Sequence, residues 1–186
     1  PPGRSFGGII GRVRLDAVSP VYVSDIYMQN QPERTKVKAI LTVNNTSAKT
    51  EKQDIYFSVY EKENPGKVIL EKKLPRVALK QGTNVVTMEL HCPEARIWDL
   101  DTPYLYVCGV DVKSGKKLSD RAVQTFGFRW FEPVGIGKDA MLRLNGRRVM
   151  LRTAISWGYW PATGLYATPE MAEKQVSVAK SMGLNM

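Results

Sequence analysis

The stretch KVKAILTVN, residues 36–44, decides the fold of this chain. Apolar side chains occupy every second position, namely Val37, Ala39, Leu41 and Val43, and polar residues occupy most of the positions between them. A period of two is typical of a strand that buries one face and exposes the other. The stretch therefore predicts a half-buried strand, and the same pattern recurs along the chain.

Further alternating stretches occur on the C-terminal side of this strand. They predict inward faces made of Ile55, Phe57 and Val59 in 54–61, Val86, Met88 and Leu90 in 84–91, and Leu105 and Val107 in 104–112. Strands are also expected at 21–27, 67–74 and 118–128, with turn signals such as Asn64-Pro65-Gly66 between the strands. About seven short strands over residues 20–131 predict an all-β, immunoglobulin-like antiparallel β-sandwich, with a closed barrel as the competing topology.

The pattern changes after residue 133. MLRLNGRRVMLR, residues 141–152, predicts a hairpin with Asn145-Gly146 as a type I′ turn. A helix is expected from Thr168, a suitable N-cap followed by Pro169, to Gly183. Its apolar stripe consists of Ala172, Val176, Ala179 and Met182.

Strand, loop, helix and strand therefore follow one another between residue 149 and the last residue, which is the start of a βα repeat. The parallel strands of such repeats are normally buried on both faces. One unit cannot bury its own faces, so we expect the chain to be a piece of a longer protein.

Charge alone suggests a nucleic-acid-binding module, because 27 Lys and Arg against 18 Asp and Glu give a net charge of +9. The basic residues, however, alternate with apolar ones and form no recognition pattern. A solvated, mildly basic surface is the better interpretation, and no nucleic-acid partner is expected. No apolar run reaches the length of about 18 residues that crosses a membrane, so no membrane partner is expected either.

Two cysteines, Cys92 and Cys108, and a single histidine, His91, are too few for a disulfide framework or a zinc site. We predict two buried thiols, no metal and no cofactor.

Four motifs together resemble a known family. They are GGIIGRVRL (7–15), IWDLDTPYLYVCGVDV (97–112), TFGFRWFE (125–132), and LRLNGRRVMLRTAISW (142–157) with AKSMGLNM (179–186). In this order they resemble the multidomain family 2 glycoside hydrolases, which include β-galactosidases, β-glucuronidases and β-mannosidases. The resemblance covers nearly the whole chain.

The resemblance implies three domains. Residues 1–19 would end an N-terminal jelly-roll domain, 20–132 would form the immunoglobulin-like sandwich, and 133–186 would begin a (β/α)₈ catalytic barrel, with its hairpin, first strand and helix. It also implies retaining exo-hydrolysis of β-linked glycosides by a pair of glutamates. Both glutamates are expected beyond Met186, so this piece is predicted to have no catalytic residue and no activity of its own.

The same resemblance indicates the partners. The carbohydrate substrate would be bound through the full-length enzyme, the piece would contact its own jelly-roll and barrel domains, and self-association is an additional expectation. Residues in the sequence do not indicate a location, whereas the resemblance implies export to the periplasm or the outside of the cell.

One loop is a candidate for substrate binding. Barrel active sites form at the C-terminal ends of the strands, and the first such loop carries Ser156, Trp157, Tyr159 and Trp160. Its aromatic rings could stack on a sugar, or the loop could pack against another domain. Many family members carry a glycine and then a His-containing motif here, which this chain lacks.

Structural roles are expected for the remaining motif residues, which are Trp98, Pro103, Tyr104, Tyr106, Gly127, Arg129, Asn145 and Gly146. Trp98 and Pro103 would cover apolar surface at the end of the sandwich, and Tyr104 would bond to nearby backbone. Arg129 is interpreted as a domain-interface residue whose guanidinium pairs with carbonyls or a carboxylate. Asn145 and Gly146 are expected to do no more than form the turn.

A second function hypothesis belongs to another class. The chain could be a stand-alone carbohydrate-binding or adhesion sandwich, which would need an exposed aromatic platform on a sheet face or a loop. The βα unit at the end of the chain argues against it.

Overall fold

The computed structural model describes residues 13–135, 137, 140–155 and 167–185, which belong to two compact units. The first unit takes the chain up to Gln29, then Lys38–Leu90 and Tyr106–Phe126, and the second takes Asn30–Val37, His91–Leu105 and the chain from Gly127 onward. In chain order the elements are β1 (Val21–Asn30), β2 (Lys36–Asn45), β3 (Glu51–Glu61), β4 (Asn64–Leu79), β5 (Gly82–His91), β6 (Tyr106–Ser114), β7 (Lys117–Phe126), β8 (Phe131–Val134), β9 (Met141–Leu144), β10 (Arg147–Val149) and α1 (Pro169–Ser181).

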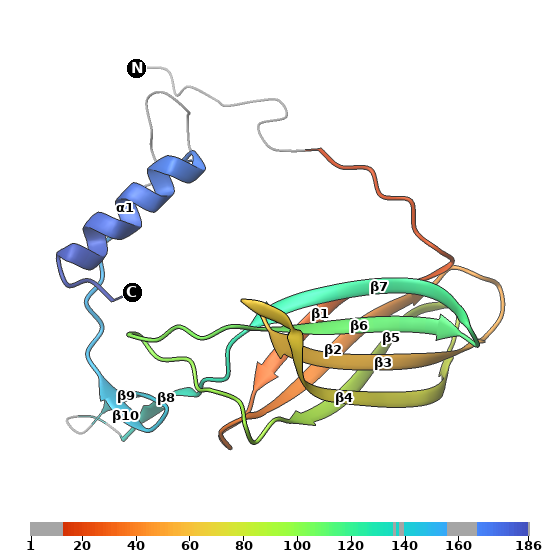
Figure 1. Cartoon of the computed structure of the whole chain (residues 1–186), viewed down its shortest axis with the longest axis horizontal. Coiled ribbons are helices and arrows are strands. Elements are labelled where there is room, and N and C mark those ends of the chain that lie inside the picture. Colours follow the sequence, from red (N-terminus) through yellow and green to blue (C-terminus); the bar gives the residue numbers. More distant parts are fainter. Residues whose placement is uncertain (1–12, 136, 138–139, 156–166, 186) are drawn as a thin grey trace. The chain divides into compact units, whose positions relative to one another are not determined.

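The first seven strands form two sheets, which overlap as two layers (Figure 1). One sheet has the order β1-β2-β5 and the other β4-β3-β6-β7, with antiparallel pairing throughout the second. Two separate sheets confirm the sandwich over the closed barrel. In constant-type immunoglobulin domains the fourth strand lies in the sheet of the first, second and fifth. Here β4 pairs with β3 instead.

The core lies between the two inner faces and is made of alternate residues, as the sequence predicts for β2 and β3. Leu41, Val43, Ile55 and Val59 have no exposed surface, and Phe57 is 2% exposed. Each such side chain contributes roughly 1.5–3 kcal/mol by leaving water. The alternation of these two strands therefore commits their odd-numbered residues to the core.

The prediction that Leu105 and Val107 form the inward face of β6 is wrong by one residue, although Val107 is itself only 9% exposed and Leu105 precedes the strand. The buried inward set is Tyr106, Cys108, Val110 and Val112. Residues 105–108 are apolar at both odd-numbered and even-numbered positions, apart from the hydroxyl of Tyr106. The local pattern therefore does not show which set points inward. Asp111 and Lys113 resolve it, because inward placement would bury two charges in the core.

An irregularity separates β4 from an ideal edge strand. Gln53 pairs with Val77 and Ile55 with Leu74, so Asp54 alone faces two residues of β4. One of these, Arg76, has a φ of 52°, in the left-handed region. Its amide donates to the Asp54 carboxylate at 2.8 Å. This is a β-bulge whose extra amide is bonded by a side chain.

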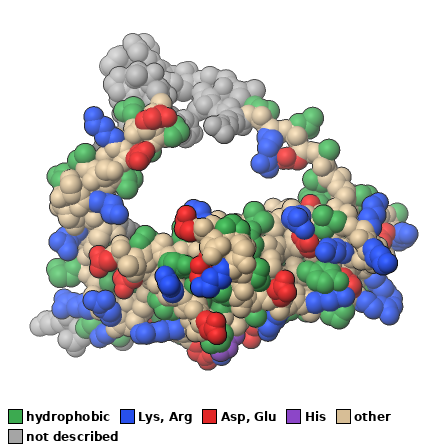
Figure 2. Space-filling model, viewed as in Figure 1, with side chains coloured by type: hydrophobic (Ala, Val, Ile, Leu, Met, Phe, Trp, Pro, Cys, Tyr) green, Lys and Arg blue, Asp and Glu red, His purple; other side chains and the backbone are tan. Residues whose placement is uncertain are grey.

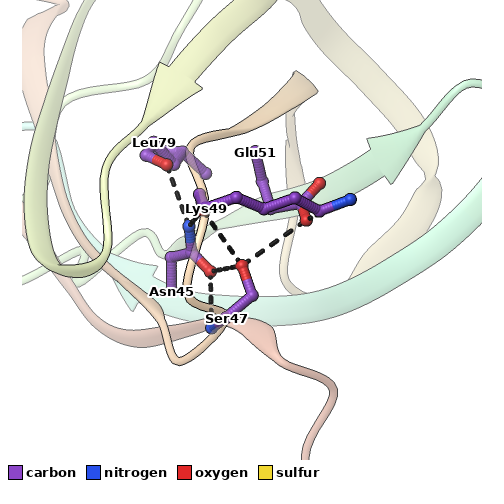
Figure 3. Close-up of polar contacts among 5 residues, drawn as sticks. All are labelled: Asn45, Ser47, Lys49, Glu51 and Leu79. Atoms are coloured by element: carbon purple, nitrogen blue, oxygen red, sulfur yellow. Dashed lines mark hydrogen bonds and ion pairs between the residues drawn. The ribbon is translucent and has the colours of Figure 1, made fainter.

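Asn45, at the end of β2, is a buried polar residue that is 1% exposed (Figure 3). Its Nδ2 donates to the carbonyls of Lys49, at 2.8 Å, and Leu79, at 2.9 Å. Its Oδ1 accepts from the amide of Ser47 at 2.9 Å and from the hydroxyl of Ser47 at 2.6 Å. One side chain thus joins the β2–β3 turn to the end of β4.

The outward face of the four-stranded sheet carries a row of polar residues. Cross-strand register places Lys73, Tyr56, Asp111 and Arg121 side by side on β4, β3, β6 and β7. Arg121 donates to both oxygens of Asp111, at 2.6 and 2.8 Å. Figure 2 shows basic and acidic side chains interspersed on the viewed face, as expected for a solvated surface.

Other expectations have simple outcomes. Cys92 and Cys108 are buried thiols, as predicted. Residues 7–12 of the proposed jelly-roll strand lie outside the described residues, and residues 13–19 form no strand. No helix in the part of the chain that the structure describes is both long enough and apolar enough to cross a membrane.

Replacing Asn45 tests the hydrogen bonds that join the β2–β3 turn to the end of β4. Asn45→Ala removes the donor to the Lys49 and Leu79 carbonyls and the acceptor for the Ser47 amide, although the Ser47 hydroxyl still donates to the Lys49 carbonyl. We therefore expect a loss of about 2–3 kcal/mol in the free energy of unfolding, measured by urea denaturation. The neighbouring Asn44→Ala is the matched control, because in the described part of the chain the Asn44 side chain accepts one exposed bond, from the Thr83 hydroxyl. Equal effects of the two substitutions would contradict the assignment.

Acid should weaken the ion pair between Asp111 and Arg121 on the outward face. Hydrogen bonding to Arg121, and then to Lys113, lowers the pKa of Asp111 below its usual 3.8. A lowered pKa stabilises the fold above the ordinary value, and this contribution disappears as pH falls through the folded value. Urea denaturation between about pH 5 and pH 2 should therefore show less acid sensitivity in Asp111→Asn. Asp25→Asn, an exposed substitution on β1 of the other sheet, is the matched control.

Candidate functional site

The second unit contains a small antiparallel sheet of order β10-β9-β8. Asn145 and Gly146 connect β9 to β10 with φ angles of 52° and 81°. Positive φ at both central residues is the signature of a type I′ turn, so this prediction is confirmed. The turn directs Asn145 back into the protein, where only 9% of the residue is exposed.

Asn145 does more than form the turn, which corrects the expectation from the sequence. Its amide and its Oδ1 bond the carbonyl and the amide of Trp130, at 2.7 and 2.9 Å. Its Nδ2 donates to the Trp98 carbonyl at 2.9 Å, and its own carbonyl accepts from Arg34 at 2.9 Å. Asn145 therefore connects three segments that are far apart in sequence.

Trp98 is the other centre of this unit. Its amide donates to the Phe128 carbonyl at 2.9 Å, and Ile97 forms a parallel bridge with Phe128. A Cβ atom at Gly127 would lie 2.9 Å from Cδ1 of the Trp98 ring, so the close approach requires glycine. The Arg129 guanidinium lies 4.7 Å from the ring centroid, in a cation–π contact. The domain-interface role of Arg129 stays a prediction.

Tyr104 and Tyr106, from the motif at 97–112, belong to different units. In the second unit, the Arg96 guanidinium lies 5.0 Å from the centroid of the Tyr104 ring. In the first unit, Tyr106 is 1% exposed and its ring centroid lies 6.2 Å from that of Phe126. The expected bond from the Tyr104 hydroxyl to backbone stays a prediction.

Helix α1 begins and ends as the sequence predicts. The Thr168 hydroxyl accepts from the Met171 amide at 3.3 Å, and Gly183 has a φ of 78°. The pKa of Glu170 is lowered by a hydrogen bond from its own backbone amide and then by the Thr168 hydroxyl. The helix has no buried residue among those described, and Val176 is 60% exposed. Its apolar stripe is therefore uncovered by the described residues.

Asn185 connects the chain after the helix to the chain after β10. Its amide donates to the Arg152 carbonyl at 3.0 Å. Its side chain accepts from the Arg152 amide at 2.8 Å and donates to the Met150 carbonyl at 3.0 Å. These three bonds join the chain before α1 to the chain after it. Residues 150–155 and 184–185 form no strand, however, so the expected strands on either side of the helix are not observed beyond the end of β10 at Val149.

A groove of about 1230 Å³ lies within the second unit. Its lining comes from the segment 98–103, from Leu144 and residues 147–155, and from α1 with the residues after it. Asp99 and Arg147 form an ion pair of 3.6 Å on its wall. Among the described residues the lining includes Asp99 and Asp101 but no glutamate.

Ala154 and Ile155 line this groove and immediately precede the predicted substrate-binding loop. Ser156, Trp157, Tyr159 and Trp160 themselves lie outside the described residues. The described part of the chain contains no cluster of His, Cys, Asp and Glu that could hold a metal ion. The groove is therefore a candidate site by position, without an assigned reactive group.

One buried polar atom near the hydrogen bonds of Asn145 has no partner among the described residues. It is Nε1 of Trp130, whose backbone is held by Asn145 on both sides. A buried donor without an acceptor costs about 1–3 kcal/mol. An acceptor from another part of the protein would remove this cost.

The fold and the hairpin extension define a class, a sandwich domain that continues into a βα-containing segment. The family model "Glycosyl hydrolases family 2" matches residues 21–129, more than half of the chain. The chain belongs to this family.

Known relatives extend the match beyond the sandwich. The β-galactosidase BoGH2A of Bacteroides ovatus is 24% identical over 183 residues, which are 96% of this chain and 21% of that protein. A solved structure of a family 2 member from Bacteroides cellulosilyticus aligns with a TM-score of 0.76 and 21% identity, over 90% of this chain and 22% of the other. The corresponding values for a Bacteroides uniformis β-glucuronidase are 0.72, 22%, 90% and 21%. The chain thus spans about a fifth of the length of these relatives.

Substitutions at Asn145 can separate the effect of the turn conformation from that of the side-chain hydrogen bonds. Asn145→Gly tolerates the positive φ but lacks the side chain, so we expect faster hydrogen exchange at residues 141–149 and at the Trp130 amide. Loss of the two side-chain bonds should cost about 1–3 kcal/mol in local opening free energy. Asn145→Asp keeps the acceptor for Trp130 and should retain more protection at that amide. Wild-type exchange in Asn145→Gly would mean that the turn alone holds the hairpin.

Proposed function

We propose that this chain is part of a retaining exo-glycoside hydrolase that acts on β-linked glycosides. The match of the family model to the sandwich is the observation that carries the proposal. Relatives named β-galactosidase and β-glucuronidase that cover nearly all of this chain support the preference for β-linked substrates. In such enzymes one carboxyl group protonates the leaving oxygen and another, about 5–5.5 Å away, attacks the anomeric carbon.

We also propose that residues 20–132 act as a non-catalytic domain and that 133–186 begin the catalytic barrel. Absence of glutamate from the described lining of the groove supports a location of both catalytic carboxylates elsewhere in the parent protein. Hydrogen bonds between Asn185 and residues 150–152 support the barrel assignment, because they join the chain before and after α1 as in a βα unit, although neither segment forms a strand.

Other parts of the parent are proposed as partners of the second unit. Ile155 and Val176 are 85% and 60% exposed, and burial of such apolar side chains is favourable. The orphan donor of Trp130 supports the same proposal, because a carbonyl of the parent could accept from it. When these parts are missing, a second copy of the chain is the alternative partner that would bury these apolar side chains.

Activity measurements test the proposal. The 186-residue chain should hydrolyse nitrophenyl β-galactoside and β-glucuronide no faster than buffer alone, because the proposal places the carboxylate pair outside it. The product of the complete gene should hydrolyse a β-glycoside, and the first-formed sugar should keep its β configuration by NMR. Hydrolysis by the short chain that persists through repurification would refute the inactive assignment. Inversion of the anomeric centre by the complete protein would refute the retaining mechanism.

A further inference from the structure

The outward face of β4-β3-β6-β7 contains a groove of about 520 Å³. Ser58 and Gly109 pair with each other in its middle, between Glu71 on β4 and Val123 on β7. The short Ser58 side chain and the bare backbone of Gly109 form a floor, and Tyr56 and Tyr60 lie two residues to either side of Ser58 on β3. The two tyrosines are about 13 Å apart along the strand, which leaves room for a pyranose ring between them.

Glycine at position 109 keeps the floor low. A Cβ atom there would lie 2.8 Å from the Ser58 hydroxyl oxygen and 3.5 Å from Cε1 of Tyr60. Any larger residue would therefore displace its neighbours and fill the groove. The shape depends on this one position.

One wall is held in place by charges. The ammonium groups of Lys73 and Lys113 lie 4.9 and 4.7 Å from the centroid of the Tyr56 ring. Lys73 is paired with Asp54 at 2.6 Å, and Lys113 with Asp111 at 3.3 Å. The Tyr56 wall is thus preorganised, which lowers the entropic cost of binding.

Three of the four basic side chains that line the groove are paired with carboxylates, and Lys72 keeps its charge. Lys73, Lys113 and Arg121 are engaged by carboxylates, and Lys72 donates to the Glu89 carbonyl at 3.3 Å. By contrast, no hydrogen bond or ion pair in the described part of the chain engages the Ser58 hydroxyl or the Glu71 carboxylate, and no ring contact there engages Tyr60. An anionic ligand would meet Glu71, whereas sugar hydroxyls can donate to it.

We propose that this groove binds a neutral glycan, with one ring stacked on Tyr60 and its hydroxyls donating to Glu71 and bonding Ser58; the choice of β-linked glycans as ligands rests on the proposed function. Aromatic faces pack against the C–H face of a pyranose ring, and a carboxylate accepts strong hydrogen bonds from hydroxyls. The site lies on the sandwich and requires no hydrolysis. Its failure would leave the proposed glycosidase assignment unaffected.

Titration calorimetry of the 186-residue chain with cellohexaose and β-1,4-galactotetraose tests the proposal. At about 5 mM glycan, even a millimolar dissociation constant is detectable. At least one of the two should bind, with shifts in the NMR signals of the Ser58 and Gly109 amides. Absence of binding to both would overturn the proposal, as would binding that leaves these amides unshifted.

Two variants with a matched control test the residues. Tyr60→Ala and Glu71→Gln should each weaken binding about fivefold or more, because they remove the stacked ring and the charged acceptor. Tyr27→Ala removes a tyrosine that is 56% exposed on β1 of the other sheet and should bind like wild type. Equal effects of Tyr60→Ala and Tyr27→Ala, with unchanged thermal unfolding, would overturn the assignment. Heparin binding that strengthens in Glu71→Gln, without glycan binding, would instead indicate a polyanion.

Discussion

Contact between the inner faces of the two sheets is the interaction on which the other features of the sandwich depend. The hydrophobic free energy of this contact requires Val110 and Val112 to point inward. Because side chains alternate along a strand, Gly109 and Asp111 must then point outward. Register with β7 places Arg121 beside Asp111, and register with β3 places Ser58 beside Gly109. The ion pairs and the groove of the outward face therefore follow from packing on the opposite side of the same strands.

The second unit is organised by hydrogen bonds more than by burial. Asn145 can bond backbone groups of two segments because a left-handed φ turns its side chain toward them. Gly127 allows the Trp98 ring to approach the backbone, and Arg129 covers that ring. Asn185 uses the same device, a side-chain amide that bonds both a carbonyl and an amide of one segment. In both cases an asparagine replaces part of a backbone ladder.

Sequence reasoning succeeded where local chemistry determines structure. Alternation in residues 36–44, the Asn145-Gly146 turn and the caps of α1 at Thr168 and Gly183 are all local, and each is confirmed. The inward face of β6 was misassigned because residues 105–108 are apolar at both parities. The wider role of Asn145 and the groove above Gly109 depend on residues distant in sequence. No local pattern reveals such contacts. The presence of asparagine in the turn is a usable signal only in that its side chain can bond to groups outside the turn. The aromatic loop candidates, Ser156 to Trp160, stay a prediction.

The bulge in β4 has a consequence for behaviour in concentrated solution. β4 is one of the two outer strands of its sheet, and an outer strand offers unpaired backbone groups to other chains. Arg76 interrupts the regular spacing of those groups, and the preceding residue, Pro75, has no amide hydrogen to offer. Lysines 72 and 73 add positive charge beside the interruption. An incoming strand would find neither a continuous row of donors nor a flat surface, so this side of the sandwich resists the intermolecular strand addition that starts amyloid-like aggregation.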